Sequence, residues 1–306
     1  MIEKLTPVTL ARHVFRSFGQ DGNPCVVLHH FDFETGGDID FCADFPSSSS
    51  FLNELGPKLI ELGWNVAQVL NHEQSGAYIV AFNESAIDDV VLFDFCADYR
   101  VRGHKILSVS DMQEDPRVLT WGGLGSSPLI ELTYRFVKSA AKKKPVAEVV
   151  QDLGDLWQSC GGGFQKWLHK CWSVELDTWD EPAVQEALRA LNVRLKKRRR
   201  SFAELKLKMG RVLKPSGLIL ECSVSEAENL REILSPFFRD VVIGYQNILP
   251  ILGSTLVIVQ EGEVSVLKQC FLTKIGCWLR SEDRDEIVGY LASRTSHYQG
   301  WTRQNA

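Results

Sequence analysis

The chain has 306 residues, of which 44% are hydrophobic and 24% are charged, and its formal net charge at pH 7 is −5. These ordinary values predict a globular protein that is long enough for two or three domains. No apolar run approaches 18 residues, the first residues lack the basic head and apolar core of a signal peptide, and the eight cysteines form no Cys-x-x-Cys pair. We therefore expect a cytoplasmic protein with reduced thiols and no membrane span.

The first hundred residues alternate between short apolar runs and polar breaks. Their periodicity predicts helices over residues 6–18 and 51–62. Strands are expected over residues 25–31, 38–43, 65–70, 77–82 and 90–95. This order is typical of an α/β (α+β) fold with a mixed sheet and a helix on one of its faces.

The rest of the chain predicts two further parts. The glycine-rich run at 122–128 marks a boundary near residue 120, and residues 129–209 are expected to be mostly helical, with breaks at Gly161–Gly163 and at 180–182. Strand, helix and strand are then expected over 218–222, 225–234 and 255–260. The predicted domains are therefore 1–120, 121–212 and 213–306.

Three acidic residues form the main candidate site. Asp38 and Asp40 are two residues apart in a predicted strand and so share one face of it, while Asp94 lies in a later apolar run. If the two strands pair, the three carboxylates meet and can hold Mg²⁺ or Mn²⁺, which prefer hard oxygen ligands. Asp98 competes with Asp94 as the third acid, and turn chemistry with surface charge is the plainer interpretation of the Asp-x-Asp pair.

Other residues are candidates for nucleotide binding. The paired glycines Gly36 and Gly37 stand directly before the two acids, and the histidines His29 and His30 end the first predicted strand. Lys138 and Lys142 are four residues apart, so they lie on one face of a predicted helix and could contact phosphates. The histidines and the lysines each have a plainer interpretation. The histidines could simply be partly buried at a strand end, and the two lysines could simply be solvated.

A basic stretch follows the helical part. Residues 194–214 contain ten Lys and Arg residues, but Phe202 is the one aromatic residue among them. Binders of single-stranded nucleic acid alternate basic and aromatic side chains. We therefore interpret this stretch as a basic surface connector and expect no nucleic acid partner.

The motifs occur in an order that resembles a known arrangement. They are Pro24-Cys25-Val26-Val27-Leu28-His29, Asp38-Ile39-Asp40, Gln68 to His72-Glu73, Asp94 to Asp98-Tyr99-Arg100, and Ser127-Pro128 with Glu131, Tyr134 and Lys138. Over about residues 1–145 the chain resembles the nucleotidyltransferase-like N-terminal domain of bacterial two-part proteins with a thymidylate-kinase-like C-terminal half. Genes for such proteins commonly lie among surface-polysaccharide genes. The resemblance implies metal binding by Asp38, Asp40 and Asp94, with Lys138 near the phosphates.

Two departures from that pattern stand out. Nucleotidyltransferases usually present Gly-Ser about ten residues before the first Asp, where this chain has His29-His30. The C-terminal part resembles a degenerate P-loop kinase, because residues 221–228 stand where the phosphate loop belongs and contain three glutamates but no glycine or lysine. We expect no phosphate binding at this loop.

The sequence therefore supports two functional hypotheses. The first is a Mg²⁺-dependent nucleotidyltransferase that moves a nucleotidyl group from a nucleoside triphosphate to a sugar, sugar phosphate or protein hydroxyl. It predicts that Asp40→Asn abolishes binding of the Mg²⁺–nucleotide complex and leaves the melting temperature nearly unchanged. The second is a non-catalytic relative that serves as a binding or scaffold protein in surface-polysaccharide assembly, with a protein partner at the C-terminal part.

Overall fold

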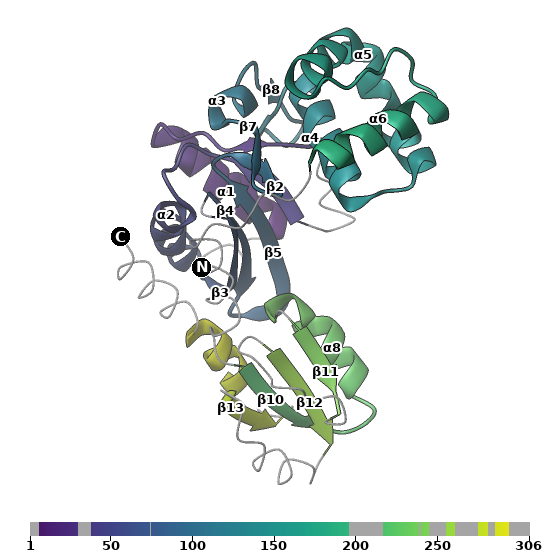
Figure 1. Cartoon of the computed structure of the whole chain (residues 1–306). Coiled ribbons are helices and arrows are strands. Elements are labelled where there is room, and N and C mark those ends of the chain that lie inside the picture. Colours follow the sequence, from purple (N-terminus) through teal and green to yellow (C-terminus); the bar gives the residue numbers. More distant parts are fainter. Residues whose placement is uncertain are drawn as a thin grey trace. The chain divides into compact units, whose positions relative to one another are not determined.

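The structure is a computed structural model that describes residues 6–29, 38–73, 75–195, 217–238, 240–244, 255–260, 275–280 and 285–293 (Figure 1). The chain divides into two compact units. Unit 1 comprises Met1–Val14, Ser47–Asp94 and Ser201–Ala306, and unit 2 comprises Phe15–Pro46 and Phe95–Arg200. The expected boundary at residue 212 lies outside the described residues, and the one near residue 120 stays a prediction.

Unit 2 combines short strands with a group of helices. Its strands are β1 (Val26–Val27), β2 (Asp38–Cys42), β6 (Tyr99–Val101), β7 (His104–Leu107), β8 (Arg117–Val118) and β9 (Leu124–Gly125). Its helices are α3 (Val109–Met112), α4 (Pro128–Lys142), α5 (Val146–Trp172) and α6 (Glu181–Arg194), and it also holds the end of α1 (Pro7–Gln20). One hydrophobic core joins β1, β2 and the β6–β7 hairpin to α4, α5 and α6. The helices are therefore held on the strands that carry the candidate acids Asp38 and Asp40.

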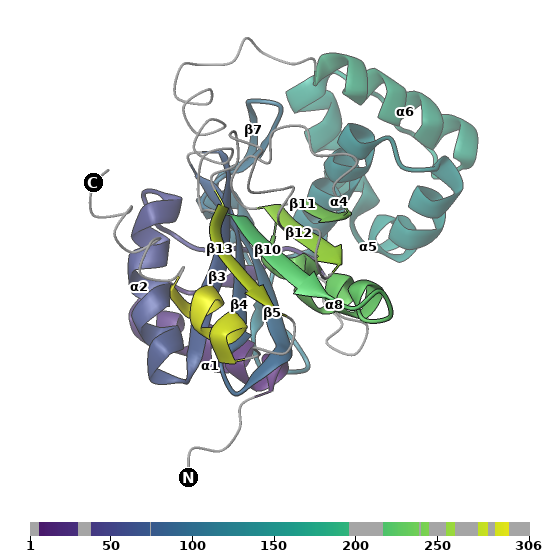
Figure 2. The ribbon, with the colours of Figure 1, turned by 90° about the horizontal axis from the view of Figure 1, so that it is seen from below.

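Unit 1 holds a parallel sheet and the longer strands. Its elements are α2 (Ser48–Glu61), β3 (Trp64–Glu73), β4 (Gly76–Asn83), β5 (Ala86–Cys96) up to Asp94, β10 (Gly217–Cys222), α8 (Ala227–Leu234), β11 (Asp240–Ile243), β12 (Thr255–Gln260) and β13 (Ile275–Arg280). The strand order β11-β12-β10-β13 is parallel throughout, and Figure 2 shows α8 beside this sheet. Phe82 of β4 contacts Phe237 with ring centroids 5.5 Å apart, within one core that includes both sets of strands.

The larger sheet has the strand order β3-β4-β5-β2-β1-β9-β8. In it β2 is antiparallel to β1, with Val26 opposite Cys42, and β9 is parallel to β1. The mixture of parallel and antiparallel pairs confirms the predicted α/β class. The strand order also makes β5 the neighbour of β2, which the metal hypothesis requires.

One local prediction is wrong, and one predicted boundary segment contains secondary structure. Helix α5 runs without a break from Val146 to Trp172, so Gly161–Gly163 do not interrupt it. Gly161 is buried, and a Cβ at this position would lie 2.9 Å from the Trp157 ring, so glycine here allows a close contact. The glycine-rich run at 122–128 is not only a linker, because it contains β9, and Pro128 begins α4.

Apart from the first strand, the other predicted helices and strands that the structure describes agree with expectation to within a few residues. No element was predicted at the positions of β6, β7, α3, β8, β11 and β13. β1 covers only Val26–Val27 of the expected 25–31, and residues 30 and 31 lie outside the described residues. Most of the basic stretch at 194–214 also lies outside them. Within the described part of the chain, no helix is long and apolar enough to cross a membrane. Cys25, Cys42, Cys96, Cys160, Cys171 and Cys222 are free thiols.

Candidate metal and phosphate site

Aromatic packing on one face of the sheet fixes the direction of the acids. Phe41 of β2 is fully buried and contacts Phe15 and Phe95, with ring centroids 4.9 and 5.8 Å apart. Successive side chains of a strand point to opposite faces. Because Phe41 and Phe95 point to the packed face, the neighbouring Asp40 and Asp94 point to the other one.

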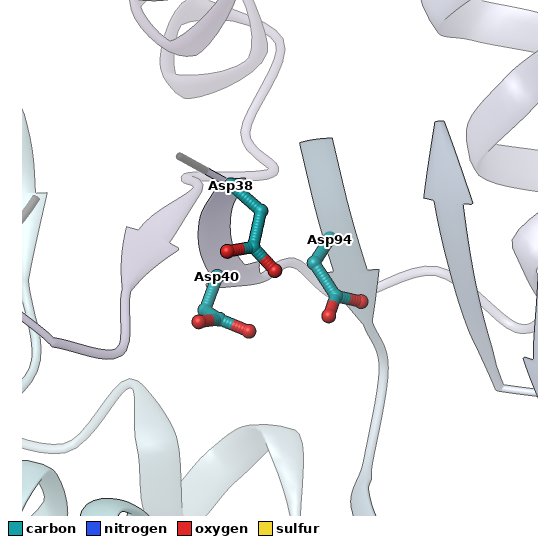
Figure 3. Close-up of side chains that lie close together, drawn as sticks. All are labelled: Asp38, Asp40 and Asp94. Carbon is teal, nitrogen blue, oxygen red and sulfur yellow. The ribbon is translucent and has the colours of Figure 1, made fainter. Parts of the chain in front are cut away.

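The three predicted acids meet on that other face. Ligand oxygens of Asp38, Asp40 and Asp94 all lie within 4.8 Å of one another, and Figure 3 shows the three carboxyl groups clustered. An octahedral Mg²⁺ with oxygens at about 2.1 Å separates its ligands by about 3–4 Å, so small side-chain rotations suffice to coordinate one ion. The residues present fit a hard divalent cation.

Asp98, the alternative third acid, belongs to a different group of charges. Its carboxylate forms ion pairs with Arg100 at 3.1 Å and with Lys105 at 2.9 Å. Among the described residues, the geometry therefore brings Asp94 rather than Asp98 to the Asp-x-Asp pair.

Asp40 is the most enclosed of the three acids. It is 3% exposed, and its Oδ1 accepts a hydrogen bond of 2.7 Å from the Tyr134 hydroxyl. Its Oδ2 pairs with the Lys138 ammonium at 2.8 Å and with Nε2 of His29. Burial raises the pKa of the Asp40 carboxyl, but the hydrogen bonds and positive charges of His29 and Lys138 outweigh burial and hold that pKa well below its ordinary value. Asp40 is therefore a carboxylate throughout the physiological pH range.

Helix α4 brings the partners of Asp40 to the sheet. The Ser126 hydroxyl is fully buried and donates to the Leu28 carbonyl at 3.0 Å, and the Ser126 amide donates to the Val27 carbonyl. These bonds fasten the residue before the helix to β1, which pairs with β2. Tyr134 and Lys138 follow at one-turn spacing, so one face of α4 is held against Asp40.

Aromatic rings enclose the Tyr134 side chain. Its ring lies 4.4 Å from that of Tyr99 and 5.8 Å from the imidazole of His29, which is nearly parallel to it. The Lys138 ammonium lies 5.1 Å from the same ring and 3.0 Å from its hydroxyl oxygen. The hydroxyl that bonds Asp40 is thus held by packing on several sides.

A pocket of about 260 Å³ opens beside the acids. It is lined by His29, Asp38, Asp40, Arg135, Lys138, Ser139, Lys142, Lys144, Val149, Asp152 and Leu153. Four of these side chains, Arg135, Lys138, Lys142 and Lys144, carry a positive charge. A pocket whose wall combines these cations with the carboxylates of Asp38, Asp40 and Asp152 suits a metal-bound phosphate chain.

The predicted nucleotide-binding residues fall into two sets. His29 and Lys138 contact Asp40, and Lys142 lines the pocket. His30, Gly36 and Gly37 lie outside the described residues. Among the described residues, the sequence interpretation missed Tyr134 and Arg135 of α4 as functional candidates, and it also missed the polar pocket residues Ser139, Lys144 and Asp152.

The spacing of α4 carries the signal for Tyr134, and the signal for Arg135 is only partly local. Tyr134 is four residues before Lys138, a spacing that places them on one helix face. Arg135 pairs with Glu131 at 3.4 Å and approaches Asp152 of α5 at 4.0 Å, and Glu131 also pairs with Arg117. The pairing with Asp152 needs the position of α5, which the sequence does not give.

The loop between β10 and α8, where the resemblance predicts a degenerate phosphate loop, is closed by its own side chains. The Ser223 hydroxyl and amide both donate to Oε2 of Glu226, at 2.7 and 3.3 Å. Here a glutamate carboxylate accepts the backbone N–H that a phosphate would use. The geometry is consistent with the expectation that this loop does not bind phosphate, which stays a prediction.

No protein-family model, curated protein or solved structure matches this chain. We therefore infer the function from the geometry of the residues around Asp40.

Proposed function

We propose that this protein is a divalent-metal-dependent nucleotidyltransferase. It transfers a nucleotidyl group from a nucleoside triphosphate to the hydroxyl of a sugar, sugar phosphate or protein: the hydroxyl oxygen loses its proton and bonds the α-phosphorus, and the bond from the α-phosphorus to the β-phosphate breaks and releases pyrophosphate. The observation that carries the proposal is the meeting of Asp38, Asp40 and Asp94 within 4.8 Å beside a pocket lined with cations. We further propose that β1, β2, β5 and α4 form a nucleotidyltransferase-like core and that the protein acts in the cytoplasm, which its reduced, scattered cysteines support.

Each group of residues has a distinct role in this proposal. Asp38, Asp40 and Asp94 hold Mg²⁺ or Mn²⁺, which, when bound, neutralises the triphosphate and lowers the pKa of a coordinated nucleophile. Lys138, Lys142 and the other cations of the pocket bind and orient the phosphate chain. The pocket wall holds four basic groups and three carboxylates, two of which are assigned to the metal, so a polyphosphate with a bound divalent cation suits it better than a monoanion does.

The experiment that tests the proposal is a thermal-shift and calorimetric screen of the four common nucleoside triphosphates with and without Mg²⁺. We expect at least one triphosphate to raise the melting temperature with Mg²⁺ and to lose most of that effect when EDTA is added. Asp38→Asn is the informative variant, because Asp38 lies at the partly exposed end of β2 and its replacement removes a metal ligand without burying a new polar group.

The matched control is Asp98→Asn, since Asp98 is a partly exposed carboxylate that pairs with Arg100 and Lys105 away from the acid cluster. Binding should weaken at least tenfold in Asp38→Asn and stay within threefold of wild type in Asp98→Asn. Equal binding by wild type and Asp38→Asn would refute the metal site.

One observation favours a second candidate function, a non-catalytic binding or scaffold protein of surface-polysaccharide assembly. Both carboxylate oxygens of Asp40 already have partners within the chain, from Tyr134, Lys138 and His29. If this network is only structural, no triphosphate in the screen will change the melting temperature with Mg²⁺ or Mn²⁺. A pull-down with the intact chain as bait would then be used to search for a partner protein that binds the C-terminal residues.

A further inference from the structure

The ammonium of Lys138 is a cation that already contacts the acid cluster. Its Nζ lies 2.8 Å from Oδ2 of Asp40 and 3.0 Å from the Tyr134 hydroxyl oxygen. The Asp40 carboxylate is 3% exposed, so little water can weaken the attraction between the two charges. Lys138 is therefore a pocket cation that forms a direct ion pair with Asp40, one of the proposed metal ligands.

We propose that divalent metal and polyphosphate bind this site together, because Lys138 must exchange Asp40 for a phosphate oxygen before a metal ion can coordinate Asp40. The inference rests on the proposed function and adds to it the condition that Lys138 moves to the polyphosphate before the metal coordinates Asp40. Without polyphosphate, Lys138 competes with the metal for Asp40. With polyphosphate in the pocket, Lys138 neutralises a phosphate, which removes its ammonium charge from Asp40, and the contact of His29 Nε2 with Oδ2 remains.

The distances make the two cations mutually exclusive on the same oxygen. A Mg²⁺ ion coordinates a carboxylate oxygen at about 2.1 Å, so an ion on Oδ2 would lie within about 4–5 Å of an ammonium that is itself 2.8 Å from this oxygen. An ion and an ammonium at this separation repel each other strongly where water is scarce. One of the two must move away, and the lysine is the mobile one.

The side chain of Lys138 has somewhere to move. It is 24% exposed, its four-carbon stem is flexible, and it already lines the pocket where the phosphate chain is proposed to lie. Lys142 lies one turn further along α4 and lines the same pocket, but the structure records no ion pair between it and Asp40. Variants of the two lysines therefore distinguish competition for Asp40 from the general effect of a nearby positive charge on metal binding.

The test measures Mn²⁺ binding to the full chain without phosphate, by the electron paramagnetic resonance signal of free Mn²⁺. We expect Lys138→Met to bind Mn²⁺ at least tenfold more tightly than wild type, and Lys142→Met to stay within threefold of wild type. Lys138→Gln is a second variant, in case the methionine variant folds poorly. It keeps a neutral donor for Asp40 and should fall between wild type and Lys138→Met.

A second measurement follows the binding of inorganic tripolyphosphate by calorimetry, with Mg²⁺ or with EDTA. In wild type Mg²⁺ should tighten this binding at least tenfold, and the factor should fall at least fivefold in Lys138→Met. If Lys138→Met and wild type bind Mn²⁺ equally while Mg²⁺ still tightens tripolyphosphate binding, the competition is refuted and the proposed function stands. If no variant binds Mn²⁺ and Mg²⁺ has no effect on tripolyphosphate, both are refuted.

Discussion

Replacing Asp40 by Asn should destabilise the protein strongly, although the sequence alone predicts a nearly unchanged melting temperature. The structure changes this expectation because the Asp40 side chain is only 3% exposed and both of its oxygens have partners. Asn preserves the volume but removes the charge, and its amide nitrogen would face donors. Lys138 and His29 would then lack their partner in a site where water is scarce.

The size of the effect follows from the contacts. Hydrogen bonds to a charged group contribute about 1.5–3 kcal/mol each, and breaking a buried ion pair costs about 3–5 kcal/mol. The side chains of Lys138 and His29 are 24% and 25% exposed, so water recovers part of this loss. We expect the free energy of unfolding to fall by about 2–4 kcal/mol, which for a unit of this size lowers the melting temperature by about 4–15 °C.

The loss should also depend on pH with a definite sign. The pKa of Asp40 is lower in the folded chain than in the unfolded chain, so its contribution is complete well above the unfolded value of about 4. The contribution decreases as the pH falls below about 4, because the unfolded chain then takes up a proton that the folded chain resists. The difference between wild type and Asp40→Asn should therefore be largest at pH 6–7 and should shrink at acidic pH.

The assay is urea denaturation followed by tryptophan fluorescence at several pH values, since Trp157, Trp167 and Trp179 belong to the core of unit 2. Asp98→Asn is the control, because its partners Arg100 and Lys105 are 36% and 48% exposed and such pairs contribute about 0–1 kcal/mol. If Asp40→Asn loses no more than Asp98→Asn at pH 7, the reasoning about the buried network is wrong.

Three further predictions concern neighbouring residues. Tyr134→Phe removes the hydroxyl that bonds the Asp40 carboxylate and should cost about 1.5–3 kcal/mol in urea denaturation, with Mn²⁺ affinity reduced about threefold; an unchanged affinity would show that Tyr134 does not orient Asp40. Phe41→Ala should cost about 3–5 kcal/mol in the same assay, because Phe41 is fully buried among aromatic rings, and a loss below 1 kcal/mol would contradict this packing. Iodoacetamide at pH 8 should label the exposed Cys171 and leave Cys42 unlabelled by mass spectrometry, since burial raises the pKa of the Cys42 thiol to about 12; labelling of Cys42 before Cys171 would contradict its burial.

The acid cluster was predictable from sequence because it depends on local rules. Side chains of a strand alternate, so Asp38 and Asp40 share a face, and the apolar run before Asp94 indicates a second strand. The pairing of β5 with β2 is a longer-range property, since about fifty residues separate these strands. The sequence supplies the candidates for this pairing, and the fold decides between Asp94 and Asp98.

The partners of Asp40 were less predictable. Lys138 could be proposed from its spacing on a helix, but the depth of Asp40 depends on how α4 packs against the sheet, which no local pattern encodes. The unbroken helix α5 shows the same limit. Three consecutive glycines favour a break by propensity, but α5 residues on both sides of them are buried in the core of unit 2, which overrides that preference; they are Val149, Leu153, Phe164 and Leu168.

Because Ser126 is hydrogen-bonded to the first strand segment, the number of residues from Ser126 to Lys138 is constrained. Every residue of an α-helix turns it by about 100°, so one residue inserted between Ser126 and Tyr134 would rotate Tyr134 and Lys138 away from Asp40. An insertion in the turn after Lys142 leaves that angular relation intact. In any homologue that keeps this site, we therefore expect the segment from the serine to the lysine to have an invariant number of residues, while the connection between α4 and α5 varies in length.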